Sequence, residues 1–164
     1  MSLGLYLHIP YCFSKCRYCD FYSHPGERGV PDAYVEALVR ELDRFAPERP
    51  LQPDTLYFGG GTPSLLRPEQ AKRLIDAARP LPGAEITLEA NPETVTEQSL
   101  AGFREAGVNR ISFGVQSARD TQLRTLGRPH TAKQARAAFA AARRAGFANI
   151  SGDIMLALPH YTEA

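Results

Sequence analysis

Residues 3–21 read LGLYLHIPYCFSKCRYCDF, an apolar, strand-like stretch that leads directly into three closely spaced cysteines. The apolar part, residues 3–9, has the length and composition of a buried β-strand. Cys12, Cys16 and Cys19 follow it with the spacing C-x-x-x-C-x-x-C, and the chain has no other cysteine. This pattern predicts a strand followed by one short loop that supplies three thiolate ligands.

The number of cysteines limits what this loop can bind. An odd count cannot be used up in disulfides, and a closed structural zinc site almost always has four ligands. A four-iron cluster held by three protein thiolates leaves one iron open to another ligand. From the loop alone, three interpretations remain: an iron–sulfur cluster, a zinc ion with His8 or His24 as the fourth ligand, and unliganded thiols.

Length, composition and charge describe an ordinary soluble chain of one domain or less. The sequence has 164 residues, of which 43% are hydrophobic and 23% charged, and its formal net charge is +1. Such a charge does not attract nucleic acid, no apolar run has the length of a membrane span, and the first residues lack the features of a signal peptide. We therefore expect a cytoplasmic protein with reduced thiols, no nucleic-acid partner and no transmembrane segment.

Strand-like runs alternate with helical stretches along the whole sequence. The expected strands are residues 3–9, 55–58, 85–89, 110–115 and 150–156, and the expected helices are residues 32–45, 68–79, 97–106, 119–126 and 132–145. Gly107 and Gly146 stand where a helix needs a left-handed residue at its end. The alternation predicts an α/β fold with a parallel sheet and right-handed crossovers, and both a doubly wound sheet and a TIM-type barrel fit it. Little sequence follows the fifth strand, so we expect the N-terminal portion of a larger protein.

Polar or glycine-rich signals recur where each expected strand ends. The cysteine loop follows the first strand, the run GGGTP (59–63) the second and EANP (89–92) the third, while Gln116 ends the fourth strand and Asp153 lies near the end of the fifth. Ligands bind at the carboxyl ends of the strands in parallel α/β folds. The sequence therefore predicts one site along this edge of the sheet.

Several residues near this edge allow two interpretations each. Three consecutive glycines let a ligand approach the backbone closely, whereas a tight turn with positive φ requires only one. Glu89 is either an exposed edge carboxylate or a buried one paired to a ligand. The aromatic side chains around the cysteines either shield a bound cluster from water or fill the core; they are Tyr11, Phe13, Tyr18, Phe21 and Tyr22.

The four histidines show no mutual spacing that is typical of a metal site. They are His8, His24, His130 and His160. We expect surface or capping roles for them.

Six motifs together resemble a known family. They are YLHIPYCFSKCRYCDF (6–21), YFGGGTPSLL (57–66), TLEANPE (87–93), NRISFGVQS (109–117), LGR (126–128) and DIMLALP (153–159). In this order and spacing they resemble the N-terminal half of radical S-adenosylmethionine (radical SAM) proteins, within the oxygen-independent coproporphyrinogen III oxidase-like family. The resemblance implies a partial (β/α) radical SAM barrel of parallel strands, truncated after about the fifth strand. Residues 1–164 would be the N-terminal part of its core domain, without the rest of the barrel and the following domain.

The resemblance also implies a cofactor chemistry. Cys12, Cys16 and Cys19 would hold a [4Fe–4S] cluster whose fourth iron binds S-adenosylmethionine, and the reduced cluster would cleave this cofactor to a 5′-deoxyadenosyl radical. Tyr6, Gly60 and Glu89 would contact the cofactor on the cluster. A second cofactor molecule or nearby groups would be contacted by Gly61, Thr62, Gln116, Arg128 and Asp153, and Tyr18 is counted with the cofactor-binding residues. No catalytic residue beyond the cluster ligands is implied.

One departure from the family pattern distinguishes between its branches. The oxidases have a further cysteine two residues after the third, where this chain has Phe21. This indicates the heme chaperone branch, whose members bind heme and transfer it to hemoproteins. The alternatives are an oxidase that decarboxylates two propionates of coproporphyrinogen III, and a binding-only iron–sulfur heme carrier, so enzymatic activity stays open. The implied partners are S-adenosylmethionine, heme or a porphyrinogen, a hemoprotein acceptor and an electron donor.

Overall fold

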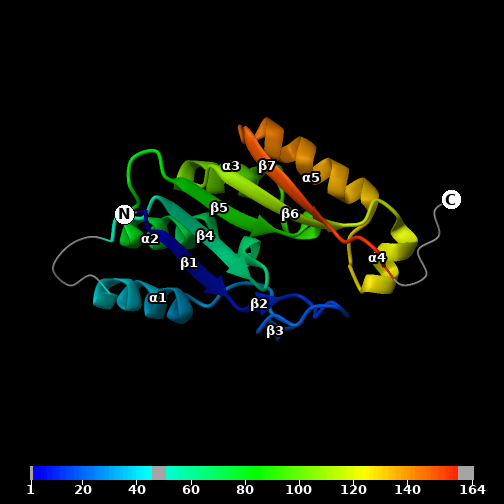
Figure 1. Cartoon of the computed structure of the whole chain (residues 1–164), viewed down its shortest axis with the longest axis horizontal. Helices are drawn as coiled ribbons and strands as arrows, with labels where there is room; N and C mark the ends of the chain where they lie inside the picture. The colour runs from blue at the N-terminus through cyan, green and yellow to red at the C-terminus, as the bar shows by residue number, and fades with distance from the viewer. Residues whose placement is uncertain (1, 46–50, 159–164) are drawn as a thin grey trace.

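The computed structural model describes residues 2–45 and 51–158 as an α/β structure with one main sheet (Figure 1). Five strands form that sheet: β1 (Gly4–Ile9), β4 (Thr55–Gly60), β5 (Glu85–Ala90), β6 (Arg110–Gln116) and β7 (Asn149–Ile154). Five α-helices accompany them: α1 (Asp32–Phe45), α2 (Pro68–Ala78), α3 (Glu97–Ala106), α4 (Asp120–Leu126) and α5 (Ala132–Arg144). These elements match the expected ones to within a few residues.

The order of the strands selects the barrel type of fold. All neighbouring strands are parallel, and they follow one another in the sheet as β1-β4-β5-β6-β7, which is their order along the chain. Helices α1, α2, α3 and α5 pack against each other in the same sequence along one face (Figure 1). A doubly wound sheet reverses its strand order and carries helices on both faces, so the arrangement is that of a partial TIM-like barrel.

The two faces of the sheet differ in chemistry because side chains alternate along each strand. The face toward the helices is apolar and fully buried, as at Phe58, Leu88 and Phe113. Burial of each such side chain contributes about 1.5–3 kcal/mol to folding. Glu89 and Ser112, paired across β5 and β6, belong to the opposite face and line a cavity there. The alternation thus places polar side chains on the face of the sheet that lies away from the helices.

Glycines end two of the helices in the way the sequence indicates. Gly107 follows α3 with φ of 113°, and Gly146 follows α5 with φ of 91°. Both values lie in the left-handed region that other residues avoid. The two helix-to-strand junctions that resemble each other in sequence therefore share this backbone conformation.

The fifth strand is shorter than the sequence predicts, and some short elements were not expected. Strand β7 ends at Ile154, near the end of its partner β6 at Gln116, so the apolar Leu156 continues as an exposed loop residue. The elements β2 (Tyr11–Cys12), β3 (His24–Pro25), η1 (Pro63–Leu65) and η2 (Pro92–Thr94) have only two or three residues each. Segments this short carry no readable hydrophobic period.

Within residues 2–45 and 51–158, no helix combines the length and the apolar character needed to cross a bilayer.

Candidate metal and cofactor site

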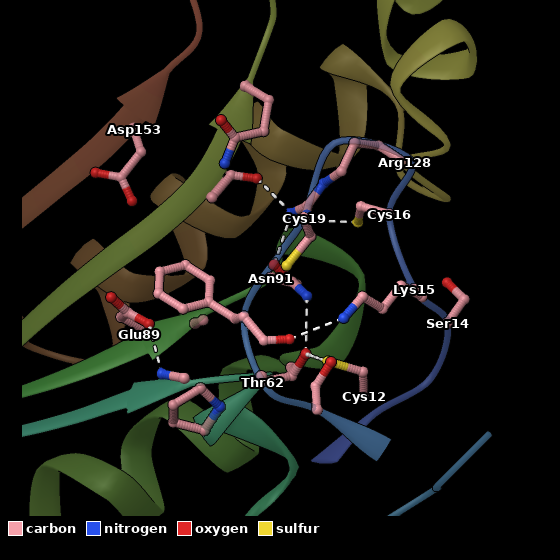
Figure 2. A pocket seen from close by; sticks show the side chains of 18 of the residues that line it. Cys12, Ser14, Lys15, Cys16, Cys19, Thr62, Glu89, Asn91, Arg128 and Asp153 are labelled. Carbon is pink, nitrogen blue, oxygen red and sulfur yellow. Dashed lines mark hydrogen bonds between the residues drawn. The ribbon is translucent and has the colours of Figure 1, made fainter. Parts of the chain in front are cut away.

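A cavity of about 410 Å³ opens at the carboxyl ends of the strands (Figure 2). Its wall consists of the cysteine loop, the segments after β4 and β5, the ends of β6 and β7, and the connection between α4 and α5. Eleven of the expected site residues line it: Cys12, Cys16, Tyr18, Cys19, Gly60, Gly61, Thr62, Glu89, Gln116, Arg128 and Asp153. The structure therefore brings almost all of them together at one edge of the sheet.

Backbone hydrogen bonds close the cysteine loop. The short strands β2 and β3 pair in parallel, and the amide of Glu27 donates to the carbonyl of Cys12 at 3.0 Å. Within the loop, Nζ of Lys15 donates to the carbonyl of Phe21 at 2.8 Å. The amide of Arg17 donates to the carbonyl of Leu126 at the end of α4, at 3.1 Å. The loop is thus attached both to itself and to the α4–α5 connection.

The three cysteines are free thiols that line the cavity. The hydroxyl of Thr62 donates to Sγ of Cys12 at 3.5 Å. Among the described residues, no group of three or more His, Cys, Asp or Glu side chains is arranged around a single ion. Thiolates are the ligands of both zinc and iron–sulfur clusters.

Arg128 is a buried cation that faces the cysteine loop (Figure 2). Its residue is 9% exposed, and its Nη2 donates to Oδ1 of Asn91 and to the carbonyl of Gly114, both at 2.6 Å. Its Nη1 donates to Sγ of Cys16 at 3.4 Å, while its buried Nε has no partner. No described carboxylate forms an ion pair with it. A buried charge needs a counter-charge, so this guanidinium calls for an anion in the cavity.

Burial and the neighbouring side chains act in opposite directions on the pKa of Arg128. Burial alone lowers it, but the hydrogen bond to Cys16 and the nearby Tyr18 and Glu93 outweigh burial, and the net shift is upward. The guanidinium therefore stays charged beside the cysteines.

Glu89 is partly buried, so it is not an exposed edge carboxylate, and its pairing to a ligand stays a prediction. Its Oε1 accepts a hydrogen bond from the hydroxyl of Tyr57 at 2.8 Å, and its Oε2 accepts one from the amide of Gly60 at 3.3 Å. Burial raises the pKa of Glu89, although these two hydrogen bonds act in the opposite direction. The carboxylate faces the cavity and is available to a cationic group there.

Replacing Glu89 with glutamine is expected to give a melting temperature that increases relative to wild type as pH rises. Because the folded-state pKa of Glu89 lies above its unfolded value, the native chain binds more protons, and wild-type stability falls as pH rises through the raised pKa. Glutamine cannot ionise; its single oxygen can accept from Tyr57 but its NH2 cannot accept from the amide of Gly60, a loss that does not depend on pH. Thermal unfolding of both proteins between about pH 4 and about pH 8 measures the difference. A difference that stays constant with pH would contradict a raised pKa at Glu89.

The chain itself supplies a reason for the glycines after β4. Gly60 has a φ of 115°, which disfavours other residues. A Cβ at Gly61 would lie 2.8 Å from the carbonyl oxygen of Tyr11 and 2.9 Å from Sγ of Cys12. The positive φ at Gly60 therefore fits the interpretation as a turn, and the close approach at Gly61 is made by the cysteine loop; approach of a ligand to these glycines stays a prediction.

Tyr6 is the expected site residue that lies outside the cavity lining. Its side chain is 52% exposed, and its ring stacks on Tyr57 with a centroid distance of 6.0 Å and an interplanar angle of 17°. Tyr57 in turn donates a hydrogen bond to Glu89, which lines the cavity. The ring of Tyr57 therefore lies between Tyr6 and the cavity.

The expectation of core filling is wrong for most aromatic residues of the cysteine loop. Phe13, Tyr18, Phe21 and Tyr22 are all exposed, whereas Tyr11 packs against the core. Partial burial nevertheless raises the pKa of the Tyr18 hydroxyl to about 12, because its effect outweighs the lowering by the nearby Arg128. Shielding of a bound cluster by these rings stays a prediction.

The histidines need one correction. His8 is half-buried, and its Nε2 lies 2.9 Å from the carbonyl oxygen of Tyr22. His24 is exposed in β3, and His160 lies outside the described residues. The side chain of His130 is completely buried, so a surface role is wrong for it.

Several residues that line the cavity were not among the expected site residues, and Asn91 and Ser112 are two of them. Asn91 fixes Arg128, and Ser112 lines the cavity between Glu89 and Asp153. Asn91 belongs to the polar run that ends β5, and Ser112 shares the inward face of β6 with Gln116. The strand-end rule and the two-residue period of a strand would have identified both.

Comparison with known proteins gives the family. The model of the radical SAM superfamily matches residues 6–164. This chain belongs to the radical SAM superfamily. Among curated radical SAM relatives, the heme chaperone HemW of Escherichia coli K12 is 44% identical over 96% of this chain and 43% of its own length. HemW of Bacillus subtilis is 40% identical over 96% of the chain and 43% of its length.

Two further radical SAM relatives extend the comparison. The mitochondrial radical S-adenosyl methionine domain-containing protein 1 of Bos taurus is 43% identical over 95% of this chain and 36% of its own length. The solved structure of coproporphyrinogen III oxidase HemN from Escherichia coli superposes with a TM-score of 0.86 and 31% identity over 98% of this chain and 38% of that protein. The chain thus spans less than half the length of these relatives.

Membership of the radical SAM superfamily implies a [4Fe–4S] cluster and S-adenosylmethionine, and the cavity fits them. Three free cysteines supply the thiolates. The buried Arg128, with its unpartnered Nε and no carboxylate partner among the described residues, fits beside an anionic cluster. At about 410 Å³ the cavity has the size of a small-molecule site.

Proposed function

We propose that residues 1–164 are the N-terminal part of the radical SAM core domain of a heme chaperone. The observation that carries the cofactor site is the convergence of three cysteines and one buried arginine on a single cavity. The observation that selects the branch is Phe21, which stands two residues after Cys19 in place of the oxidases' additional cysteine. The reduced thiols that such a site requires are typical of the cytoplasm.

In this proposal the cluster is bound by Cys12, Cys16 and Cys19. Thr62 and Arg128 donate hydrogen bonds to two of the three sulfurs. Such outer hydrogen bonds orient metal ligands and tune the bound metal. When bound, the reduced cluster supplies the electron that cleaves S-adenosylmethionine to methionine and a 5′-deoxyadenosyl radical.

The remaining wall of the cavity would bind S-adenosylmethionine. Glu89 presents a carboxylate to the amino group of the methionine part, and the glycine segment offers backbone polar groups nearby. Tyr6 would act from behind Tyr57 rather than by lining the cavity. A second cofactor molecule or neighbouring groups would meet the other lining residues: Tyr18, Gly61, Thr62, Gln116, Arg128 and Asp153.

The molecule that the whole protein would bind or convert is a tetrapyrrole. The HemW relatives at 40–44% identity are heme chaperones, which supports heme as the cargo. In this proposal a hemoprotein would accept the heme, and an electron donor would reduce the cluster. The likeness to HemN supports the alternative, oxidative decarboxylation of two propionates of coproporphyrinogen III. A heme carrier that never cleaves S-adenosylmethionine is the second alternative.

Electron paramagnetic resonance of the anaerobically reconstituted, dithionite-reduced protein tests the cofactor site. We expect a [4Fe–4S]⁺ signal that changes when S-adenosylmethionine is added, because the fourth iron has no protein thiolate. Uptake of zinc without such a signal would contradict the cluster assignment.

Incubation with each tetrapyrrole then separates the branches. We expect the reconstituted protein to bind heme, seen as a shifted Soret band, and to form no protoporphyrinogen from coproporphyrinogen III under reducing conditions with S-adenosylmethionine. Clear formation of protoporphyrinogen would establish the oxidase instead. Heme binding together with no cleavage of S-adenosylmethionine under any condition would favour the binding-only carrier.

A further inference from the structure

Gln116, at the end of β6, has an unusual backbone conformation for a residue that lines the cavity. Its φ is 64°, in the left-handed region, and it follows a register shift between Gly114 and Gln116 in the pairing with β7. The left-handed region is costly for residues other than glycine, and it persists only where the surroundings impose it. Gln116 is therefore held in place by its neighbours.

Three consecutive carbonyl groups at this strand end are each hydrogen-bonded from a different element. The carbonyl of Gly114 accepts from Nη2 of Arg128 at 2.6 Å, and that of Gln116 accepts from the amide of Met155 at 3.0 Å. Between them, the carbonyl of Val115 accepts from the amide of Ser117 at 2.8 Å, which closes a turn around Gln116, and it also lies 3.1 Å from Nε2 of His130. A carbonyl oxygen can only accept, so Nε2 of His130 carries the hydrogen.

His130 lies between three elements near the strand end. Its side chain is completely buried, and its Nδ1 lies 3.2 Å from Oε2 of Glu93, which belongs to η2 after β5, but neither of these two atoms forms a hydrogen bond. The next residue, Thr131, caps the first turn of α5 through its hydroxyl. The hydrogen bond of the imidazole is therefore the one to β6.

Three polar side chains lie close together beside Gly114 at this strand end. A Cβ placed on Gly114 would lie 3.0 Å from Nη2 of Arg128, 3.2 Å from Oδ1 of Asn91 and 3.2 Å from Nε2 of Gln116. The amide of Gln116 therefore belongs to the polar group that faces the cavity next to Cys16. A small rotation at Val115 would move that amide out of this group.

We propose that His130 is a positioning residue for the cofactor site: together with the amide of Ser117 it fixes the Val115 carbonyl, and so keeps the strained Gln116 with its amide aimed into the cavity. This inference rests on the proposed function, in which Gln116 contacts S-adenosylmethionine or a group beside it. His130 itself does not line the cavity.

A double-mutant cycle tests whether His130 acts through Gln116. The dissociation constant for S-adenosylmethionine is measured on reconstituted wild type, His130→Leu, Gln116→Ala and the double variant, with iron content and melting temperature as independent readouts. We expect His130→Leu to weaken binding about tenfold in the wild-type background and to cause almost no further loss in the Gln116→Ala background, since coupled residues are non-additive. We also expect His130→Gln, which keeps an N–H donor, to restore most of the affinity.

A matched control separates positioning from general destabilisation. Phe147 is buried in the core away from the cavity, so Phe147→Leu should lower the melting temperature without changing the dissociation constant. If His130→Leu does not fold, His130→Phe keeps a ring of similar shape but has no N–H donor for Val115, and it should weaken binding in the same Gln116-dependent way.

Two results would overturn the inference, and they are distinguishable. Additive losses in the cycle, or wild-type affinity in both His130→Leu and His130→Phe, would show that His130 does not act through Gln116 and would leave the proposed function intact. A wild-type protein that carries its cluster but does not bind S-adenosylmethionine would overturn both.

Discussion

Replacing Cys16 with serine is expected to reduce the iron and sulfide content of the anaerobically reconstituted protein to about a tenth of wild type or less, since loss of even an outer partner of a metal ligand costs about 10–100-fold in affinity. The change leaves two thiolates for a cluster that the proposal assigns to three. It also removes the sulfur that accepts a hydrogen bond from Nη1 of the buried Arg128.

Colorimetric iron and sulfide assays, together with the visible absorption of the cluster, measure this effect. Ser14→Ala is the matched control, because Ser14 is an exposed residue of the same loop and no sulfur is lost. Full iron and sulfide content in Cys16→Ser would show that Cys16 is not a ligand, and a loss of cluster in Ser14→Ala would show that the loop tolerates no change.

Replacing Gly61 with alanine is expected to destabilise the fold and to disturb the cysteine loop at once. The added Cβ would lie 2.8 Å from the carbonyl oxygen of Tyr11, 3.0 Å from that of Ile9 and 2.9 Å from Sγ of Cys12. Backbone oxygens cannot move aside like the end of a flexible side chain, and the amide of Gly61 is itself bonded to Ile9 at 2.8 Å. Overpacking of this kind costs about 1–3 kcal/mol, which lowers the melting temperature of a chain of this size by roughly 2–12 °C.

Gly29→Ala is the control for this prediction. The nearest atom to a Cβ at Gly29 is the carbonyl oxygen of Leu65 at 4.0 Å, and its backbone needs no left-handed conformation. Differential scanning calorimetry and cluster content are measured for both variants. We expect Gly29→Ala to resemble wild type, and a Gly61→Ala protein that melts like wild type and assembles a full cluster would refute the close approach of β4 and the loop.

Local sequence patterns predicted the helices, the strands and the edge of the sheet that carries the site. Apolar runs and helix-ending glycines such as Gly107 depend on a residue and its sequence neighbours, so they are readable without a fold. The position of the site followed from a general rule about parallel strands, which brought Glu89, Gln116 and Asp153 to one cavity although they lie far apart in sequence. Arg128 lies on a connection between helices, where that rule says nothing, and only the resemblance to a family indicated it.

What the amino-acid sequence by itself determined was the kind of chemistry: three cysteines on one loop after a strand, with polar residues at successive strand ends. The tertiary structure decided the rest. It selected the barrel order of strands over a doubly wound sheet, buried His130 between Val115 and Glu93, and placed an arginine without a carboxylate partner, among the residues described, beside Cys16. These features depend on contacts between segments tens of residues apart, and such contacts arise from packing of the whole sheet and its helices rather than from local preference.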